Sequence, residues 1–109
     1  MVTVTFRRDS RNRLSSVFAD GHAGWADRGD DIVCAAASAI LQAALLGLTA
    51  VAHVDVGAER TPGRLSMSWP ESVRDREDVR AIIATAELSI ESIARDYPEH
   101  VRCERAPEP

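Results

Sequence analysis

Residues 21–38 read GHAGWADRGDDIVCAAAS, a glycine-rich segment that leads directly into an apolar helix. Gly21, Gly24 and Gly29 are too many for a helix or strand interior, but they suit a sharply bent loop. Such a loop can cover a reactive group as a lid, or it can be a tight structural turn. From Val33 to Leu48, apolar residues recur at the three- and four-residue spacing of a buried helical stripe. The stretch therefore predicts a loop followed by a core helix.

The expected start of this helix places a cysteine where a thiol is activated. Asp30 or Asp31 is the expected N-cap, and Gly47 is the expected terminator. Cys34 then falls in the first turn, where unpaired amides and the helix dipole lower a thiol pKa from its ordinary value of about 8.5. The same amides can hold a developing oxyanion.

A histidine stands in the loop just before the helix. A neighbouring imidazole is the second common means of deprotonating a thiol, so His22 is the candidate base for Cys34. Ser38, four residues after Cys34, lies on the same side of the helix and either lines a substrate cleft or fills space between alanines. Asp31 or Asp27 is a candidate to orient the imidazole, although a helix cap and a solvated acid explain them equally well.

The run from Gly21 to Gly24, followed by residues 29–36, resembles the ribosomal-processing cysteine protease family (Prp, the YsxB-like proteins). The resemblance implies a cysteine endopeptidase that removes a short N-terminal extension from large-subunit ribosomal protein twenty-seven. It also implies a homodimer. Position by position, Cys34 matches the nucleophile and His22 the general base, while Gly21 and Ser38 match positions near the bound peptide. Trp25 departs from the residue usual in the family's loop.

Two other functions stay open. In the first, the chain is a noncatalytic ribosome-associated binding module, in which Cys34 is a small buried hydrophobe and His22 caps a loop. In the second, the chain is a dyad peptidase that cuts a different cytoplasmic protein.

The rest of the chain predicts a single α+β domain over residues 1–109, a small sandwich of about five strands with two main helices. The second helix is predicted by an apolar stripe from Val79 to Tyr97, with a cap at Ser72, Asp75 or Asp78 and a stop at Pro98. We expect residues 106–109 to form a disordered tail. Alternating or β-rich runs predict strands at 2–6, 14–19, 50–57, 65–69 and 100–105, with a turn at 61–63.

Charge and cysteine usage limit the expected partners. The chain has 17 acidic and 13 basic side chains, all of the latter arginine, for a net charge of −4. This balance disfavours direct nucleic-acid binding and suits a basic ribosomal protein precursor, although it also serves solubility alone. The exposed position expected for Leu88 and the alanine-rich first helix add weak support for a homodimer.

We identify no apolar run that approaches the roughly 18 residues of a membrane span and no signal-peptide core, so we expect a cytoplasmic protein without membrane partners. In that compartment a Cys34–Cys103 disulfide is not expected, and Cys103 is interpreted as structural. His53 and His100 are isolated, so no metal site and no cofactor are predicted.

Overall fold

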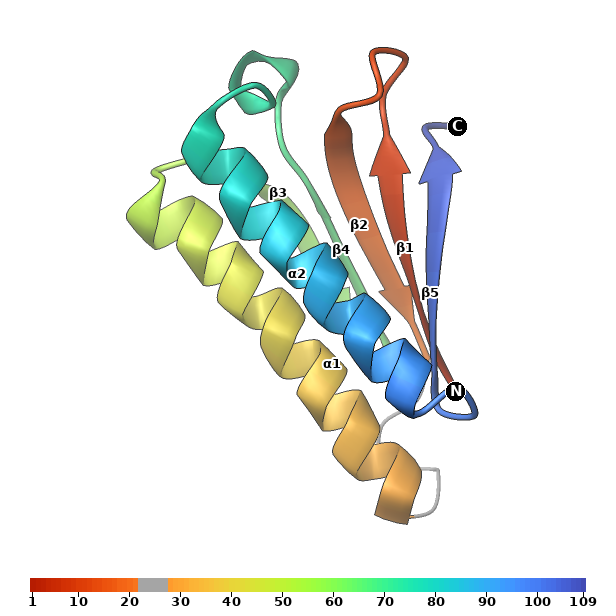
Figure 1. The fold of residues 1–109 in the computed structure, drawn as a ribbon. Helices are drawn as coiled ribbons and strands as arrows, with labels where there is room; N and C mark the ends of the chain where they lie inside the picture. The colour runs from red at the N-terminus through yellow and green to blue at the C-terminus, as the bar shows by residue number, and fades with distance from the viewer. Residues whose placement is uncertain (22–27) are drawn as a thin grey trace.

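The computed structural model describes residues 1–21 and 28–109, with the backbone alone for residues 28–31. In this part of the chain, five strands form one sheet in the order β3-β4-β2-β1-β5, in which only the β1–β5 pair is parallel. Two helices lie side by side across one face of that sheet (Figure 1). The α+β architecture with five strands and two helices is therefore confirmed. The elements are β1 (Val2–Arg8), β2 (Leu14–Asp20), α1 (Arg28–Leu46), β3 (Gly57–Thr61), β4 (Arg64–Ser68), α2 (Glu77–Asp96) and β5 (Val101–Pro107).

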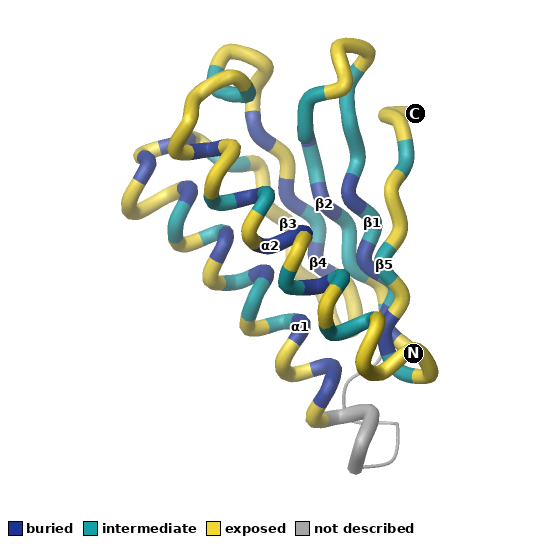
Figure 2. The backbone as a smooth tube through the Cα atoms, in the orientation of Figure 1, coloured by how far each residue is buried: buried dark blue, intermediate teal, exposed yellow. Residues whose placement is uncertain are grey.

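The core lies between the sheet and the inner faces of the helices, which appear as the dark blue positions in Figure 2. Every second side chain of a strand points to the helix side of the sheet. The helices pack against these side chains with apolar residues at three- and four-residue spacing. Trp69 follows β4, is buried, and donates from Nε1 to the Leu14 carbonyl oxygen at 2.9 Å. The largest fully buried apolar side chains are Phe6, Leu41, Leu48, Met67, Ile83 and Ile90.

The predicted strand at 50–57 is wrong. Gly47–Val51 forms a π-helical turn that continues α1, and the first strand of the following hairpin is Gly57–Thr61. Val54 is buried without being part of a strand, which explains the misleading apolar pattern. All five residues of β3 are exposed, so this edge strand has no alternating signal. The turn predicted at 61–63 is present between β3 and β4.

Both helices begin at residues other than the predicted caps. Helix α1 starts at Arg28, so Asp30 and Asp31 lie within its first turn and neither is the N-cap. The N-cap of α2 is Arg76, whose side chain makes no cap hydrogen bond, so Ser72, Asp75 and Asp78 are wrong as caps. The two C-terminal predictions agree better with the structure. The α-helical part of α1 ends before Gly47, and α2 ends at Asp96, two residues before Pro98.

Close packing explains why a glycine stands where α1 ends. A Cβ on Gly47 would lie 3.3 Å from side-chain atoms of Ile82 on α2. The glycine therefore lets the two helices approach each other at that level.

The C-terminal residues are more ordered than the sequence predicts. Strand β5 continues to Pro107, which pairs with Arg8, and the Glu108 amide donates to the Arg8 carbonyl oxygen at 2.9 Å. The expectation of a disordered tail from residue 106 is therefore wrong for residues 106–108.

One helical segment, Ile32–Val51, is long and apolar enough to cross a membrane by length and composition alone. The expectation that no such run exists is therefore wrong, because the polar residues that interrupt the run are uncharged. A third of the segment is buried, and Leu41 and Leu48 are among the most buried residues of the core. The segment accordingly serves as the core helix of this fold.

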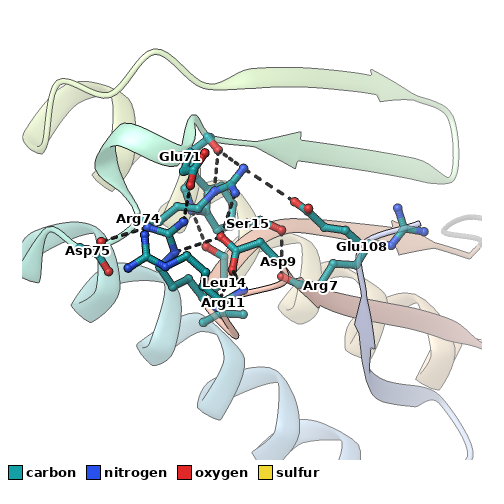
Figure 3. A network of polar contacts seen from close by, with 11 residues as sticks. Arg7, Asp9, Arg11, Leu14, Ser15, Glu71, Arg74, Asp75 and Glu108 are labelled. Atoms are coloured by element: carbon teal, nitrogen blue, oxygen red, sulfur yellow. Dashed lines mark hydrogen bonds and ion pairs between the residues drawn. The ribbon is translucent and has the colours of Figure 1, made fainter.

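An ion-pair network built on Asp9 fixes the β1–β2 turn to the segment before α2 (Figure 3). The Asp9 carboxylate accepts hydrogen bonds from the Arg11 and Arg13 amides at 2.9 and 3.0 Å, and from the Arg74 guanidinium at 2.9 Å. Burial raises the pKa of Asp9, but these hydrogen bonds and the charge of Arg13 outweigh burial and lower it to about 2. The network therefore keeps its charge well into acidic conditions.

Candidate active site

A cleft of about 440 Å³ opens where β2 ends and α1 begins, at the end of the molecule shown lowest in Figure 1. It brings together three residues predicted from the sequence, Gly21, Cys34 and Ser38. Its volume falls in the range of sites that bind small ligands or short peptide segments. The remaining lining residues are Val2, Ala19, Asp20, Ala37, Leu41, Arg60, Thr61, Pro62, Gly63, Arg64 and Leu65.

Cys34 lies on the inner face of α1, where it is 5% exposed and belongs to the apolar core while also lining the cleft. Because α1 begins at Arg28, Cys34 is the seventh helical residue, and its predicted place in the first turn is wrong. The unpaired amides of a helix belong to its first four residues, here 28–31, which precede Cys34 by roughly 5–9 Å along the axis. The oxyanion predicted to bind there is the carbonyl oxygen of the substrate, so the role of these amides stays a prediction.

Gly21 sits at the end of β2, where only a residue without a side chain fits. A Cβ at this position would lie 2.6 Å from the Met1 carbonyl oxygen and 2.7 Å from Val2 Cα, and its φ is +156°. The Gly21 amide donates to the Gly63 carbonyl oxygen at 2.9 Å. The start of β1, the end of β2 and the β3–β4 turn are thus joined at the residue before His22.

Ser38 is half-buried one turn after Cys34, on the cleft side of α1. Its hydroxyl oxygen accepts a hydrogen bond from Gln42 Nε2 at 2.8 Å. Since this bond uses only a lone pair of the oxygen, the hydroxyl proton remains available to a ligand in the cleft.

The other predicted site residues are not placed by this geometry. His22 and Asp27 lie outside the described residues, and Asp31 is described only as part of the backbone of the first turn of α1. Within residues 1–21 and 28–109, no group of three histidine, cysteine or acidic side chains is arranged to hold a metal ion.

The β3–β4 hairpin supplies residues 60–65 of the cleft lining, and none of these residues was predicted to belong to the site. The sequence predicts the Pro62-Gly63 turn, but it does not predict that this turn lies beside Gly21. Pairing of β4 with β2 carries the turn to Gly21, and this pairing depends on the sheet order.

Comparisons with known proteins agree with this fold. The family model described as "Cysteine protease Prp" matches residues 1–102. The ribosomal processing cysteine protease Prp of Staphylococcus aureus is 30% identical over 105 residues, which cover 94% of this chain and 96% of that protein.

Two solved structures share the fold. SMU.848 from Streptococcus mutans superposes with a TM-score of 0.84 at 28% identity, covering 99% of this chain and 96% of the other. The S. aureus protease Prp in complex with a substrate peptide has a TM-score of 0.86 at 24% identity, covering 96% and 99%. The resemblance found in residues 21–38 is confirmed, as is the prediction of a cysteine peptidase, because the chain belongs to the cysteine protease Prp family.

Proposed function

We propose that this protein is a cysteine endopeptidase with a Cys34–His22 dyad, and that it removes a short N-terminal extension from large-subunit ribosomal protein twenty-seven. The observation that carries the proposal is the position of Cys34 on the wall of a cleft, beside Gly21 and Ser38. The S. aureus relative is named a ribosomal processing cysteine protease, and its structure contains a substrate peptide. A ribosomal protein precursor is accordingly the proposed partner.

The mechanism follows from the chemistry of a thiol and an imidazole. His22 accepts the Cys34 proton, the thiolate attacks the scissile carbonyl, and the protonated imidazole then gives its proton to the leaving amine. Water hydrolyses the resulting thioester with His22 again as the base. Because the influence of a helix dipole fades beyond the first turn, activation of Cys34 in α1 falls mainly to the imidazole.

The cleft also suits a peptide by its lining. Val2, Leu41 and Leu65 supply apolar surface for side chains of the substrate. Gly21 leaves backbone polar groups close to the cleft, and the Ser38 hydroxyl offers a donor on the α1 side. We propose that Gly21 and Ser38 contact the bound peptide.

Thiol reactivity tests the dyad independently of the substrate. We expect iodoacetamide at neutral pH to modify Cys34 faster than Cys103 and faster than free N-acetylcysteine, as measured by mass spectrometry of the peptides. A His22→Ala variant should slow Cys34 several-fold, because the imidazole is its proposed proton acceptor.

N-acetylcysteine is needed as a reference because Cys103 is itself expected to react slowly with iodoacetamide. Burial raises the pKa of the Cys103 thiol, Arg105 opposes this effect, and Glu87 and Glu91 add to it. Equal rates for Cys34 and N-acetylcysteine, unchanged in His22→Ala, would remove the activated dyad.

A specific observation supports the second candidate, a noncatalytic binding module. Cys34 is 5% exposed and packs within the apolar core, as a structural cysteine does. An inert Cys34 in the alkylation experiment, together with an unchanged His22→Ala variant, would favour this function. A reactive Cys34 without cleavage of the ribosomal protein would instead favour a dyad peptidase with another cytoplasmic substrate.

We also propose that the protein is a homodimer that pairs through the outer surface of its helices. Large apolar side chains are exposed there, with Ile32 and Leu46 on α1 at 64% and 63% and Leu88 on α2 at 64%. Residues 32–51 carry no charge, so the α1 part of this surface presents no charged side chain to a second copy. An exposed apolar surface of this kind is typical of protein interfaces.

Sedimentation velocity tests the dimer. We expect the native protein to sediment as a dimer at micromolar concentration and a Leu46→Arg, Leu88→Arg variant as a monomer, because two charges cannot be buried against apolar partners. A native protein that sediments as a monomer would remove the proposal. The proposed compartment is the cytoplasm, where the Cys34 thiol stays reduced.

A further inference from the structure

The cleft contains an arginine that pairs with no carboxylate of the described residues, and its position follows from the register of the β3–β4 hairpin. Arg60 on the edge strand β3 lies directly opposite Leu65 on β4. Residues directly opposite in an antiparallel pair project on the same face of a sheet. Leu65 is buried in the core, so Arg60 belongs to the helix side of the sheet, the side on which Cys34 lies.

At the opposite edge of the sheet, an arginine on the same face is paired with carboxylates. Arg105 on β5 is also on the helix side, where its Nε lies 3.3 Å from Glu87 and its Nη2 lies 2.6 Å from Glu91. Both carboxylates come from α2. In α1, residues 32–46, the part of the helix whose side chains the structure describes, contain no charged side chain.

The second arginine of the cleft is already paired. Arg64 lies opposite Asp20 on β2, and its Nε approaches the Asp20 carboxylate at 3.5 Å. Among the described residues, Arg60 makes no ion pair or hydrogen bond through its side chain. The described lining contains two arginines, Arg60 and Arg64, and one acid, Asp20.

We propose that Arg60 is a specificity residue that binds an acidic side chain of the peptide in the cleft. This inference rests on the proposed peptidase function and adds a chemical preference to it: a carboxylate in the segment of substrate that passes over β3. A guanidinium suits this role because its planar donors match the two carboxylate oxygens. The preference also refines the idea of a basic substrate, since the segment held beside Cys34 would carry an acid.

The first test compares two reagents for Cys34 that differ in charge. Iodoacetate is anionic and iodoacetamide is neutral, so the ratio of their rates at Cys34 reports the electrostatic potential in the cleft. We expect Arg60→Gln to lower this ratio roughly threefold at low ionic strength. Arg80→Gln, which removes the same charge from an exposed position on α2 outside the cleft lining, should leave it unchanged.

The second test uses peptides from the cleavage region of ribosomal protein twenty-seven, with glutamate or glutamine placed in turn at each position flanking the scissile bond. We expect the native protein to prefer glutamate at one position by at least about threefold in kcat/KM, and Arg60→Gln to lose that preference. On the neutral peptides, which offer Arg60 no carboxylate, Arg60→Gln should change kcat/KM less than on the preferred glutamate peptide.

The outcomes separate this inference from the function on which it rests. If Cys34 reacts and neutral peptides are cleaved, but Arg60→Gln changes neither the rate ratio nor the glutamate preference, Arg60 is a charged residue that only protects a sheet edge. If Cys34 reacts with neither reagent, the peptidase proposal and the inference both fall.

Discussion

A Cys34→Ser variant is expected to lose at least about a thousandfold in kcat/KM on a cleavable peptide while keeping the native fold. The thiolate is the attacking species, and a serine hydroxyl gives up its proton far less readily to the same imidazole. The substitution is nearly isosteric, so the packing of α1 against the sheet is expected to persist. Circular dichroism and the urea midpoint would verify this.

The matched control is Cys103→Ser. Cys103 lies on β5, is half-buried and lines no part of the cleft, so its loss should leave kcat/KM within about twofold of native. Equal losses in the two variants, or full activity in Cys34→Ser, would contradict the assignment of the nucleophile.

The largest effect on stability is expected from Glu87→Ala, at about 3 kcal/mol of unfolding free energy. The Glu87 side chain is 9% exposed and accepts two hydrogen bonds from Arg8, each 3.0 Å long. Arg105 approaches the same carboxylate at 3.3 Å. Removing Glu87 leaves both guanidinium groups without this partner between α2 and the sheet, and urea denaturation at neutral pH would measure the cost.

Glu91→Ala is the matched control for this prediction. Glu91 lies one turn further along α2, is 37% exposed and, among the residues whose side chains are described, pairs only with Arg105. Its loss should cost less than about 1 kcal/mol, because solvent replaces a partly exposed ion pair at little cost. A similar shift of the urea midpoint in both variants would show that the burial of Glu87 adds nothing to the stability of the fold.

Local patterns predicted most elements of this fold because one face of each element packs on a single core. The stripe from Val79 to Ile93 and the alternation of Leu65, Met67 and Trp69 mark residues that are buried or adjoin the core, whereas Tyr97, the predicted end of the stripe, is 51% exposed. Strand β3 was not predicted because an exposed edge strand needs no apolar alternation. The apolar residues near Val54 led to the wrong prediction of a strand at 50–57, because an irregular segment can also be buried.

The site was predictable in part. Cys34 and Ser38 share a side of α1 through simple helical spacing, and Gly21 directly precedes the glycine-rich loop. Arg60 was not predictable, because its place in the cleft depends on strand pairing between segments about forty residues apart. The start of α1 was misjudged because Asp30 and Asp31 suit a first turn as well as a cap. That error placed Cys34 in the first turn, whereas it is the seventh residue of the helix.

Intact-mass spectrometry of the ribosomal protein twenty-seven precursor from the same genome tests the account most directly. The precursor would be incubated with the native protein and, in parallel, with Cys34→Ser. The account predicts a single defined N-terminal loss with the native protein and none with the variant, which would establish the reaction and the cleavage site together. An unchanged precursor mass in both incubations would contradict the proposed substrate, and the same loss in both would contradict Cys34 as the nucleophile.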